Sequence, residues 1–368
     1  MKNCIFYLPY KLDPNGMGAR MLRPRKMIEA FREIGYEVFV ISGFSKERKE
    51  RIKEVKNSIN NGVKYDFMYT ESSTMPTLLT DPHHLPLHPF FDFNFFDYLK
   101  CQGIKIGLFY CDIYWKFDTY GIELPWWKKQ AAIKCYEYDI EQYKKYLTKF
   151  YIPDIKVCKY VNEKALTEIA SELPPGSDNL KILHRKFQSR SFSKEPLQIF
   201  YVGGLGNQYQ ISELVKAVYS VPETELTICC RKQEWEKEKA NFASWLCDRI
   251  IVVHKNSDEL EPFYEKADIC SLMFKPDIYR EMAKPFKAYE YLAHELPVIS
   301  TKGTGIGTFV EQNKIGWNIE FSANEIENVF RTLMDNPDQL YNLRKNCQKV
   351  KTENLWTCRA MQVVKDLT

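Results

Sequence analysis

The sequence predicts an α/β fold in which two parallel sheets form two separate domains. Short apolar runs alternate with helical patterns from one end to the other, as in strand–helix–strand units. The chain has 368 residues, of which 45% are hydrophobic, enough for two packed cores. The alternation of strand and helix patterns is interrupted once, at LPPGSDN and the polar stretch that follows it through residue 194. We therefore expect domains at residues 1–185 and 195–350.

The first strand–helix–strand unit can be followed along the sequence. The apolar run 4–8 predicts a strand, PNGMGAR a loop, and 23–34 a helix that ends at Gly35. A second strand is expected at 37–41. Further elements of the first half are strands at 63–69 and 104–110, and a long helix after Pro125.

The second half restarts with the strand 197–202, a glycine loop and a helix at 211–218. The remaining expected strands are 225–229, 250–253, 269–274 and 298–301.

Composition excludes several classes of function. The 52 basic and 48 acidic residues leave a net charge of +4, too small for a nucleic-acid binder. The 11 cysteines are scattered without a C-x-x-C pair, so neither a disulfide framework nor a zinc knuckle is indicated, and a reducing cytoplasm fits. No window approaches the roughly eighteen apolar residues of a membrane span. The short N-terminal apolar run does not predict a signal peptide.

The most informative motif is KPFKAYEYLAHELPVIST, residues 284–301, which predicts a helix leading into an apolar strand. Pro285 suits the first helical position, so Lys284 and Lys287 would lie near exposed backbone N–H groups that favour an anion. Glu290 lies on the same face as Lys287 and can only accept hydrogen bonds, which fits a ribose diol. The motif therefore predicts a nucleoside diphosphate site. The alternative is a solvated surface ion pair.

A glycine loop offers a second contact for a diphosphate. Gly203, Gly204 and Gly206 follow a predicted strand and precede a helix, so bare backbone could donate N–H groups to phosphate oxygens. Glycines needed only for a tight turn would give the same pattern.

At these residues the chain resembles the GT-B glycosyltransferases, especially the retaining family-4 kind, whose donor-binding helix has the form K-x-x-E-Y-L-A-x-x-x-P-V-I. The resemblance implies two Rossmann-like domains facing across a cleft, with the nucleotide sugar in the second domain. It also implies a last helix, at 353–368, that returns to the first domain. Such enzymes generally need no metal and no cofactor beyond the donor.

The resemblance extends to the loop KGTGIGTFVE, whose Gly303 and Gly305 would approach the donor. An ordinary turn is the alternative explanation of these glycines. The chain departs from the family at the glycine loop, where relatives usually carry an Arg and a Lys for the phosphates. The basic residues expected to replace them are Lys284, Lys287, Arg231 and Lys232.

A second departure concerns the paired glutamates of the family. The later one corresponds to Glu290, whereas the earlier one falls on Met282, with Glu281 one place before it. Because the earlier glutamate usually contacts sugar hydroxyls, the donor sugar is not indicated.

In the first half, the strand in GIKIGLFYCD ends at Cys111 and Asp112. A carboxylate at the C-terminal edge of a parallel strand faces the crevice where ligands bind in such sheets, so Asp112 is predicted to orient or deprotonate an acceptor hydroxyl. Family-4 relatives often have His where this chain has Cys111. A turn or helix N-cap is the alternative role for Asp112.

Two further segments are assigned to the acceptor side. The loop with Gly16, Gly18 and Arg20 faces the same crevice in the family, and Arg20 would meet an acceptor phosphate or simply lie on the surface. In TDPHHLPLHPFFDF, His84 is assigned to the acceptor side, and one of the histidines or Asp81 would reach the acceptor as acid or base. Asp81, His83 and His88 lie nearby, but the interleaved prolines indicate an irregular loop, and we expect no metal site.

Aromatic residues and lysines interleave over residues 114–151. They indicate either packed, tyrosine-rich helices or a peripheral contact with the inner membrane surface, where five acidic residues would weaken the attraction to lipid.

The sequence therefore predicts a cytoplasmic hexosyltransferase-type enzyme with a UDP- or GDP-sugar donor. Its acceptor would be a hydroxyl of a glycan or lipid-linked molecule, in cell-surface polysaccharide or glycolipid synthesis. The alternatives are a sugar-nucleotide epimerase and a non-catalytic GT-B protein that binds a partner.

Overall fold

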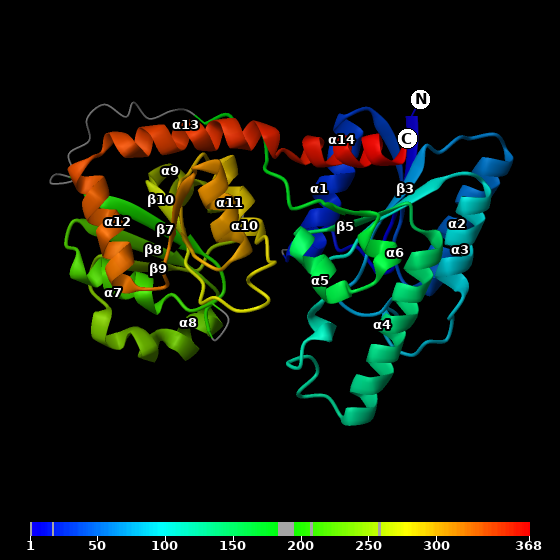
Figure 1. Ribbon diagram of the computed structural model, residues 1–368, viewed down its shortest axis with the longest axis horizontal. Helices are drawn as coiled ribbons and strands as arrows, with labels where there is room; N and C mark the ends of the chain where they lie inside the picture. The colour runs from blue at the N-terminus through cyan, green and yellow to red at the C-terminus, as the bar shows by residue number, and fades with distance from the viewer. Residues whose placement is uncertain (1, 17, 183–194, 207–208, 257–258) are drawn as a thin grey trace. The chain divides into compact units, whose positions relative to one another are not determined.

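The computed structural model describes residues 2–16, 18–182, 195–206, 209–256 and 259–368 (Figure 1). The chain divides into two compact units. The first comprises Met1–Pro175 with Trp356–Thr368, and the second Gly176–Leu355. The change of unit lies within LPPGSDN, whereas most of the polar stretch that follows it falls outside the described residues.

The first unit is a parallel sheet covered by helices, with strand order β2-β1-β3-β4-β5-β6. Its strands are β1 Lys2–Tyr7, β2 Tyr36–Ile41, β3 Phe67–Glu71, β4 Lys105–Phe109, β5 Lys149–Ile152 and β6 Ala170–Glu172. Its helices are α1 Ala19–Glu33, α2 Ser45–Asn60, α3 Phe91–Cys101, α4 Trp126–Tyr146, α5 Cys158–Val161, α6 Lys164–Thr167 and α14 Trp356–Leu367, with 3₁₀ turns η1 Thr77–Leu79, η2 Tyr114–Lys116 and η3 Ile155–Val157.

Aromatic side chains form much of the core between this sheet and α1. Phe6 of β1 packs against Phe31 of α1 and Tyr69 of β3, with ring centroids 6.3 and 5.2 Å away. The C-terminal helix α14 packs against α1 and β4. A Cβ at Gly107 of β4 would lie 2.9 Å from a methyl carbon of Leu367, so glycine lets the end of α14 approach the strand.

The prediction that the first helix begins at Arg23 was wrong, because α1 begins at Ala19. The predicted bounds would place Pro24 in the first turn, where proline is tolerated, but Pro24 lies further inside the helix. Its missing N–H would leave the carbonyl of Arg20 unpaired, and that carbonyl instead accepts a hydrogen bond from the Tyr10 hydroxyl at 3.3 Å. A tertiary contact therefore permits four more helical residues than the sequence pattern indicated.

The second unit has the same architecture, with strand order β12-β11-β10-β7-β8-β9. Its strands are β7 Leu197–Val202, β8 Thr224–Cys229, β9 Ile250–Val253, β10 Ile269–Leu272, β11 Val298–Thr301 and β12 Gly316–Ile319. Its helices are α7 Ser212–Ser220, α8 Lys232–Glu238, α9 Glu261–Lys266, α10 Phe286–Ala293, α11 Gly305–Asn313, α12 Ala323–Asp335 and α13 Asp338–Glu353, with the 3₁₀ helix η4 Lys239–Trp245.

Both faces of this second sheet are covered. One core lies against α7 and α12 and the other against α10 and α11. Alternate residues of β7, such as Ile199 and Phe200, enter opposite cores, which explains why the strand is apolar at successive positions from 199 to 202. In the described residues, all strand pairs within both sheets are parallel, so the predicted α/β fold is confirmed.

Candidate functional site

The predicted pair Lys287 and Glu290 forms an ion pair on the open side of α10, which lies between β10 and β11. Lys287 Nζ is 2.5 Å from Glu290 Oε2, and both side chains are partly buried. The opposite side of the helix buries Tyr289 and Leu292 in the core. The packing of this buried side fixes α10 in place, and it thereby fixes the positions of Lys287 and Glu290.

Tyr264 of α9 is a second partner of Glu290 that sequence reasoning missed. Its hydroxyl donates a hydrogen bond to Glu290 Oε2 at 3.0 Å, and its ring stacks on His294 with centroids 3.9 Å apart. Burial, together with the charge of Glu290, raises the pKa of Tyr264 far above its ordinary value, so the phenol stays a neutral donor. Nothing in the motif around α10 indicated this residue, because Tyr264 lies on a separate helix.

The starts of α10 and α11 lie side by side. Lys284 Nζ donates to the carbonyl of Gly305 at 3.3 Å, and Thr304 Oγ1 caps α11 by accepting from the Gly307 N–H at 3.0 Å. Pro285 is the N-cap residue of α10, not its first helical residue as predicted, because its ψ of 138° is extended. The positive N-terminal ends of α10 and α11 therefore lie close to Lys284 beyond β10 and β11, an arrangement that favours anion binding.

The glycine loop after β7 has a packing reason for its glycines. A Cβ at Gly203 would lie 2.8 Å from the Tyr201 hydroxyl, which donates to the carbonyl of Gly204 at 2.6 Å. Gly206 has φ +119°, a conformation that favours glycine. The turn explanation left open by the sequence therefore applies to these residues, and it is compatible with backbone that approaches a phosphate.

Arg231 and Lys232, predicted to help with the phosphates, lie at the start of α8 and are exposed. Arg231 is 83% exposed and pairs with Glu234 at 2.8 Å. Gly303, also assigned to the donor, has φ +76° in the turn after β11. Its neighbour Gly305 is the first residue of α11.

Arg280 is a buried cation that the sequence analysis did not single out. It is 7% exposed, and its guanidinium lies over two rings, 4.8 Å from the centroid of Tyr209 and 4.3 Å from that of Phe274. Its carbonyl accepts from the Gly305 N–H at 2.9 Å. Arg280 therefore connects the glycine loop, the segment after β10 and the start of α11. Only its basic character could have pointed to it, and this chain has 52 basic residues.

The position of the first glutamate of the resemblance is apolar and buried. Met282 is 3% exposed, whereas Glu281 is partly exposed and its N–H donates to the carbonyl of Asp277 at 3.0 Å. The described backbone thus directs the methionine, not the glutamate, into the protein interior.

In the first unit, Asp112 lies beyond the C-terminal end of β4 and directly before Ile113, the N-cap residue of the turn η2. Its Oδ1 accepts from the Tyr114 N–H at 2.8 Å, as the turn alternative predicted. Burial raises the pKa of the Asp112 carboxyl, and this hydrogen bond opposes the rise. Burial, and next the charge of Asp112, also raise the pKa of the Cys111 thiol to about 12, so Cys111 stays neutral.

The loop before α1 lies near the same end of the first sheet. Gly18 is the N-cap of α1, and the guanidinium of Arg20 lies 4.5 Å from the centroid of the Tyr10 ring. The Arg20 charge opposes a small part of the rise in the Cys111 pKa. A Cβ at Gly16 would come within 2.6 Å of Met21 Cγ, so this glycine is required by packing.

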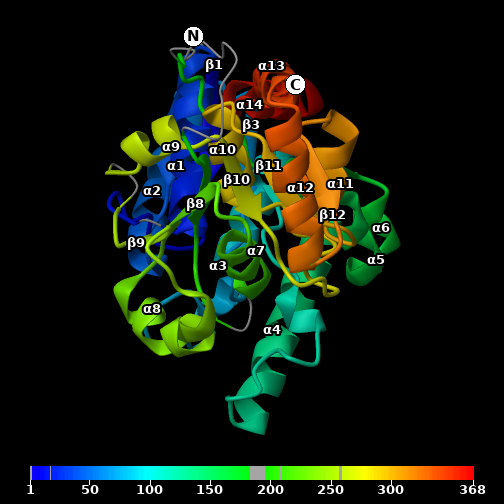
Figure 2. The same ribbon diagram turned by 90° about the vertical axis from the view of Figure 1, so that its left-hand side faces the viewer.

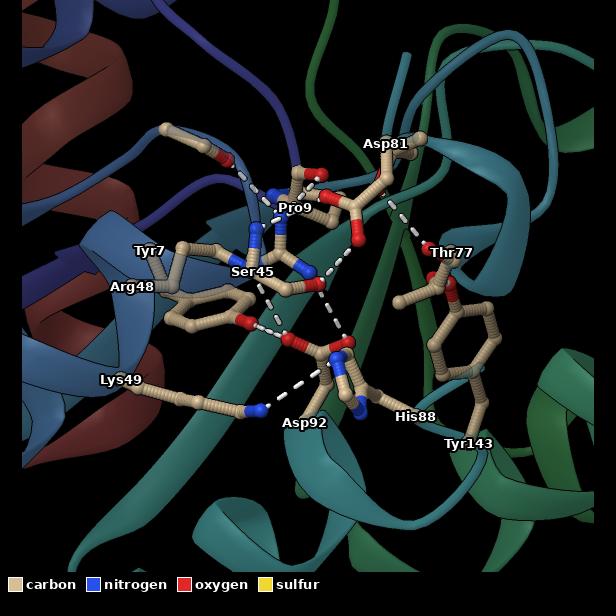
Figure 3. Close-up of polar contacts among 12 residues, drawn as sticks. Tyr7, Pro9, Ser45, Arg48, Lys49, Thr77, Asp81, His88, Asp92 and Tyr143 are labelled. Atoms are coloured by element: carbon tan, nitrogen blue, oxygen red, sulfur yellow. Dashed lines mark hydrogen bonds and ion pairs between the residues drawn. The ribbon is translucent and has the colours of Figure 1, made fainter. Parts of the chain in front are cut away.

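The histidine loop contacts several different partners (Figure 3). His84 Nδ1 lies 2.8 Å from the carbonyl of Leu79, while His88 Nε2 lies 3.3 Å from Lys49 Nζ. Asp81 accepts from the N–H and the hydroxyl of Ser45 and so caps the start of α2. In the described part of the chain, no group of three or more His, Cys, Asp or Glu side chains could hold a metal.

Beside this loop, Arg48 and Asp92 form a fully buried ion pair. Arg48 is 1% exposed, and its Nε and Nη2 donate to the two Asp92 oxygens at 3.0 and 3.1 Å. The Tyr7 hydroxyl also donates to Asp92, and Arg48 Nη1 donates to the carbonyls of Pro9 and Gly43 (Figure 3). The pair therefore joins α2 and α3 to the end of β1.

Comparison with solved structures identifies the fold. The chain has a TM-score of 0.65 to sucrose-phosphate synthase from Thermosynechococcus elongatus, at 14% identity, covering 99% of this chain and 98% of that one. The fold is GT-B. The Anabaena protein HepE in complex with UDP-glucose gives a TM-score of 0.63 at 13% identity, covering 99% and 98% of the two chains. A glycosyltransferase from Rickettsia africae gives 0.61 at 12% identity, covering 100% and 98%.

The second unit of this GT-B chain also matches a family model. Residues 196–336 match the model described as Glycosyl transferases group 1. The match includes the glycine loop, Arg280 and the α10 pair, but it excludes Asp112 and Arg20. No curated protein matches the chain.

Proposed function

We propose that the chain is a glycosyltransferase that moves a sugar from a nucleoside diphosphate sugar to a hydroxyl of a glycan or lipid-linked acceptor. One observation carries the proposal. The Glu290 carboxylate, held by Lys287 and Tyr264, lies beside the starts of two helices in the segment that matches the glycosyl transferase model. A fixed acceptor next to an anion-binding region suits the ribose and diphosphate of one nucleotide.

The proposed reaction breaks the bond between the anomeric carbon and the diphosphate oxygen, and it joins that carbon to the acceptor oxygen with retention of configuration. Lys287 would stabilise the charge that develops on the leaving diphosphate, without a metal ion. The proton of the acceptor hydroxyl would pass to Asp112 or to the departing diphosphate. Burial raises the pKa of Asp112, which would make its carboxylate a stronger base than an ordinary aspartate.

Arg280 would supply the second phosphate cation. Its guanidinium lies over the rings of Tyr209 and Phe274, and its own carbonyl accepts a hydrogen bond from the Gly305 N–H of α11. A buried charge on a fixed scaffold acts more strongly on a phosphate than the exposed Arg231, which water screens.

For donor and acceptor, the proposal extends the family resemblance. HepE was solved with UDP-glucose, which supports UDP as the first donor class to test, before GDP. The acceptor is proposed to be a precursor of cell-surface polysaccharide or glycolipid, met in the cytoplasm at the inner membrane surface. Among the described helices, none is both long and apolar enough to span a membrane.

A non-catalytic binding role has one observation in its favour. The buried Met282 stands where the resemblance expects a glutamate that contacts the sugar. Such a protein would bind a nucleotide but would transfer no sugar from any donor.

Nucleotide binding is tested first by a thermal-shift series with UDP, GDP, ADP, dTDP and CMP. A ligand at one hundred times its dissociation constant stabilises the folded protein by about 2.7 kcal/mol, a rise of several degrees in Tm. We expect UDP to give the largest shift and Glu290→Gln to lose it while keeping the unliganded Tm. No shift with any nucleotide would contradict the proposed donor site.

The role of Arg280 is tested by comparing UDP with uridine, which lacks the phosphates. We expect Arg280→Gln to weaken UDP binding by roughly ten- to a hundredfold, since a charge-assisted hydrogen bond contributes about 1.5–3 kcal/mol, and to leave uridine binding unchanged. Calorimetric titration measures both ligands. The matched control is Arg231→Gln, which removes an exposed arginine of the same unit and is expected to change UDP binding less than threefold. Equal UDP affinity of Arg280→Gln and the native protein would remove Arg280 from the site.

A further inference from the structure

The aromatic residues before and within α4 fall into two sets that the sequence could not separate. One set is packed inside the first unit. Trp115 is 7% exposed, stacks on Tyr136 with centroids 4.9 Å apart, and donates from Nε1 to the Tyr110 hydroxyl at 2.6 Å. Phe117 likewise packs on Tyr160. These contacts fix the base of the segment, and Tyr136, Tyr143 and Tyr151 are buried in the core.

The other set is exposed at the far end of the same segment. All seven residues from Ile122 to Lys128 are exposed. They include four large apolar side chains, Ile122 at 73%, Leu124 at 44%, Trp126 at 76% and Trp127 at 62%. We call residues 122–129 the α4 tip. Figures 1 and 2 both show the start of α4 and its preceding loop extending away from the sheet of the first unit.

The α4 tip has a defined local structure. The Leu124 N–H donates to the carbonyl of Gly121 at 3.1 Å, and the Lys129 N–H donates to that of Pro125, which begins the helix. Gly121 has φ +63°, and a Cβ there would lie 3.3 Å from Leu124 Cδ1, so the turn is compact. Exposed apolar groups on an ordered, protruding turn have no role in the core of this unit. A contiguous patch of this kind marks an interaction surface.

The chemistry of the α4 tip selects a bilayer among possible partners. Tryptophan is enriched at the level of lipid headgroups, where its ring is apolar and its N–H remains hydrated. Lys128 and Lys129 directly follow the two tryptophans, and Lys128 Nζ lies 5.3 Å from the centroid of the Trp127 ring. Lysines beside an inserted aromatic pair are attracted to anionic lipid. Glu123 lies within the tip and opposes part of this attraction.

We propose that the α4 tip docks the first unit on an anionic lipid bilayer, with Trp126, Trp127, Ile122 and Leu124 inserted at headgroup depth and Lys128 and Lys129 against the phosphates. The surface deepens the membrane contact of the proposed function by naming the residues that make it. Docking on lipid needs no nucleotide. Vesicle binding and nucleotide binding are therefore measured in separate experiments, and one proposal can fail without the other.

The test is co-sedimentation of the full chain, without nucleotide, with vesicles of phosphatidylcholine alone or mixed with phosphatidylglycerol. We expect the chain to bind both kinds of vesicle, and to bind the anionic vesicles about tenfold more tightly. Each lysine near an anionic surface contributes about 1 kcal/mol, and the charge of Glu123 offsets part of the contribution of the two lysines. The double variant Trp126→Ser/Trp127→Ser should lose at least tenfold in binding to either vesicle. Lys128→Glu/Lys129→Glu should abolish the preference for phosphatidylglycerol.

The matched control is Tyr341→Ser, which removes an aromatic side chain that is 53% exposed on α13. It should bind vesicles as the native chain does, and circular dichroism should show all variants folded. Failure of the native chain to bind either vesicle, or undiminished binding of the tryptophan double variant, would overturn the proposal. A native dimer in light scattering that the tryptophan variant dissociates would overturn it in favour of a second copy of the chain.

Discussion

Glu290→Gln and Lys287→Ala should each lower kcat/KM for the nucleotide sugar by roughly ten- to a hundredfold. Each change removes one charged hydrogen-bonding partner, which costs about 1.5–3 kcal/mol in the transition state. The two residues share one contact, Lys287 Nζ to Glu290 Oε2, so their effects should not add. The double variant should be less impaired than the product of the single losses, as initial rates with a labelled donor would show.

The two variants should differ in how the loss divides between kcat and KM. Glu290 is proposed to hold the ribose in both ground and transition states, so Glu290→Gln should mainly raise KM. Lys287 is proposed to act on charge that develops as the bond breaks, so Lys287→Ala should mainly lower kcat. The control is Lys239→Ala, which breaks an exposed pair with Glu236 in the same unit and should leave both constants unchanged. Native kinetics in both α10 variants would refute the assigned site.

Asp92→Ala should destabilise the first unit by about 3–5 kcal/mol, the largest stability effect we expect. The substitution leaves the guanidinium of Arg48 charged and buried without its carboxylate partner, and this uncompensated charge dominates the cost. Tyr7 also loses the acceptor of its hydroxyl. Differential scanning calorimetry should show a lower transition temperature for the first unit, with the transition of the second unit unchanged.

Two controls separate charge from packing. The double variant Arg48→Met/Asp92→Leu removes both charges and should lose less stability than Asp92→Ala, because no ion is left unpaired. Arg51→Ala breaks the exposed pair with Glu54 on the same helix as Arg48 and should cost at most about 1 kcal/mol. A loss in Asp92→Ala no larger than in Arg51→Ala would contradict the assigned role of the buried pair.

Much of the fold could be predicted because each strand and helix has its own pattern of apolar residues and its own turn residues at the ends. Strands such as β7 are covered on both faces, so most of their consecutive residues are apolar, and glycine follows the strand. Errors arose where a distant residue completed a local structure. The Tyr10 hydroxyl bonds the Arg20 carbonyl and lets α1 begin before Pro24, and no pattern within the helix indicates that contact.

The residues of the candidate site likewise fall into those that the sequence predicted and those that it did not. Lys287 and Glu290 were found because helical spacing of three places them on one face, a relation that sequence contains directly. Tyr264 and Arg280 were missed because they come from other segments and reach the site only through the parallel sheet. Their side chains are ordinary core and surface types, and only their neighbours distinguish them.

By itself, the sequence determined the alternation of strands and helices, the division into two domains, and the charge pair on α10. These follow from short-range periodicity and composition, which do not depend on how distant segments meet. Only the tertiary structure decided that Trp115 is stacked in the core while Trp126 is exposed, although both lie in one aromatic stretch. Burial depends on what the rest of the chain places against a side chain, so residues of one type in one segment can have opposite roles.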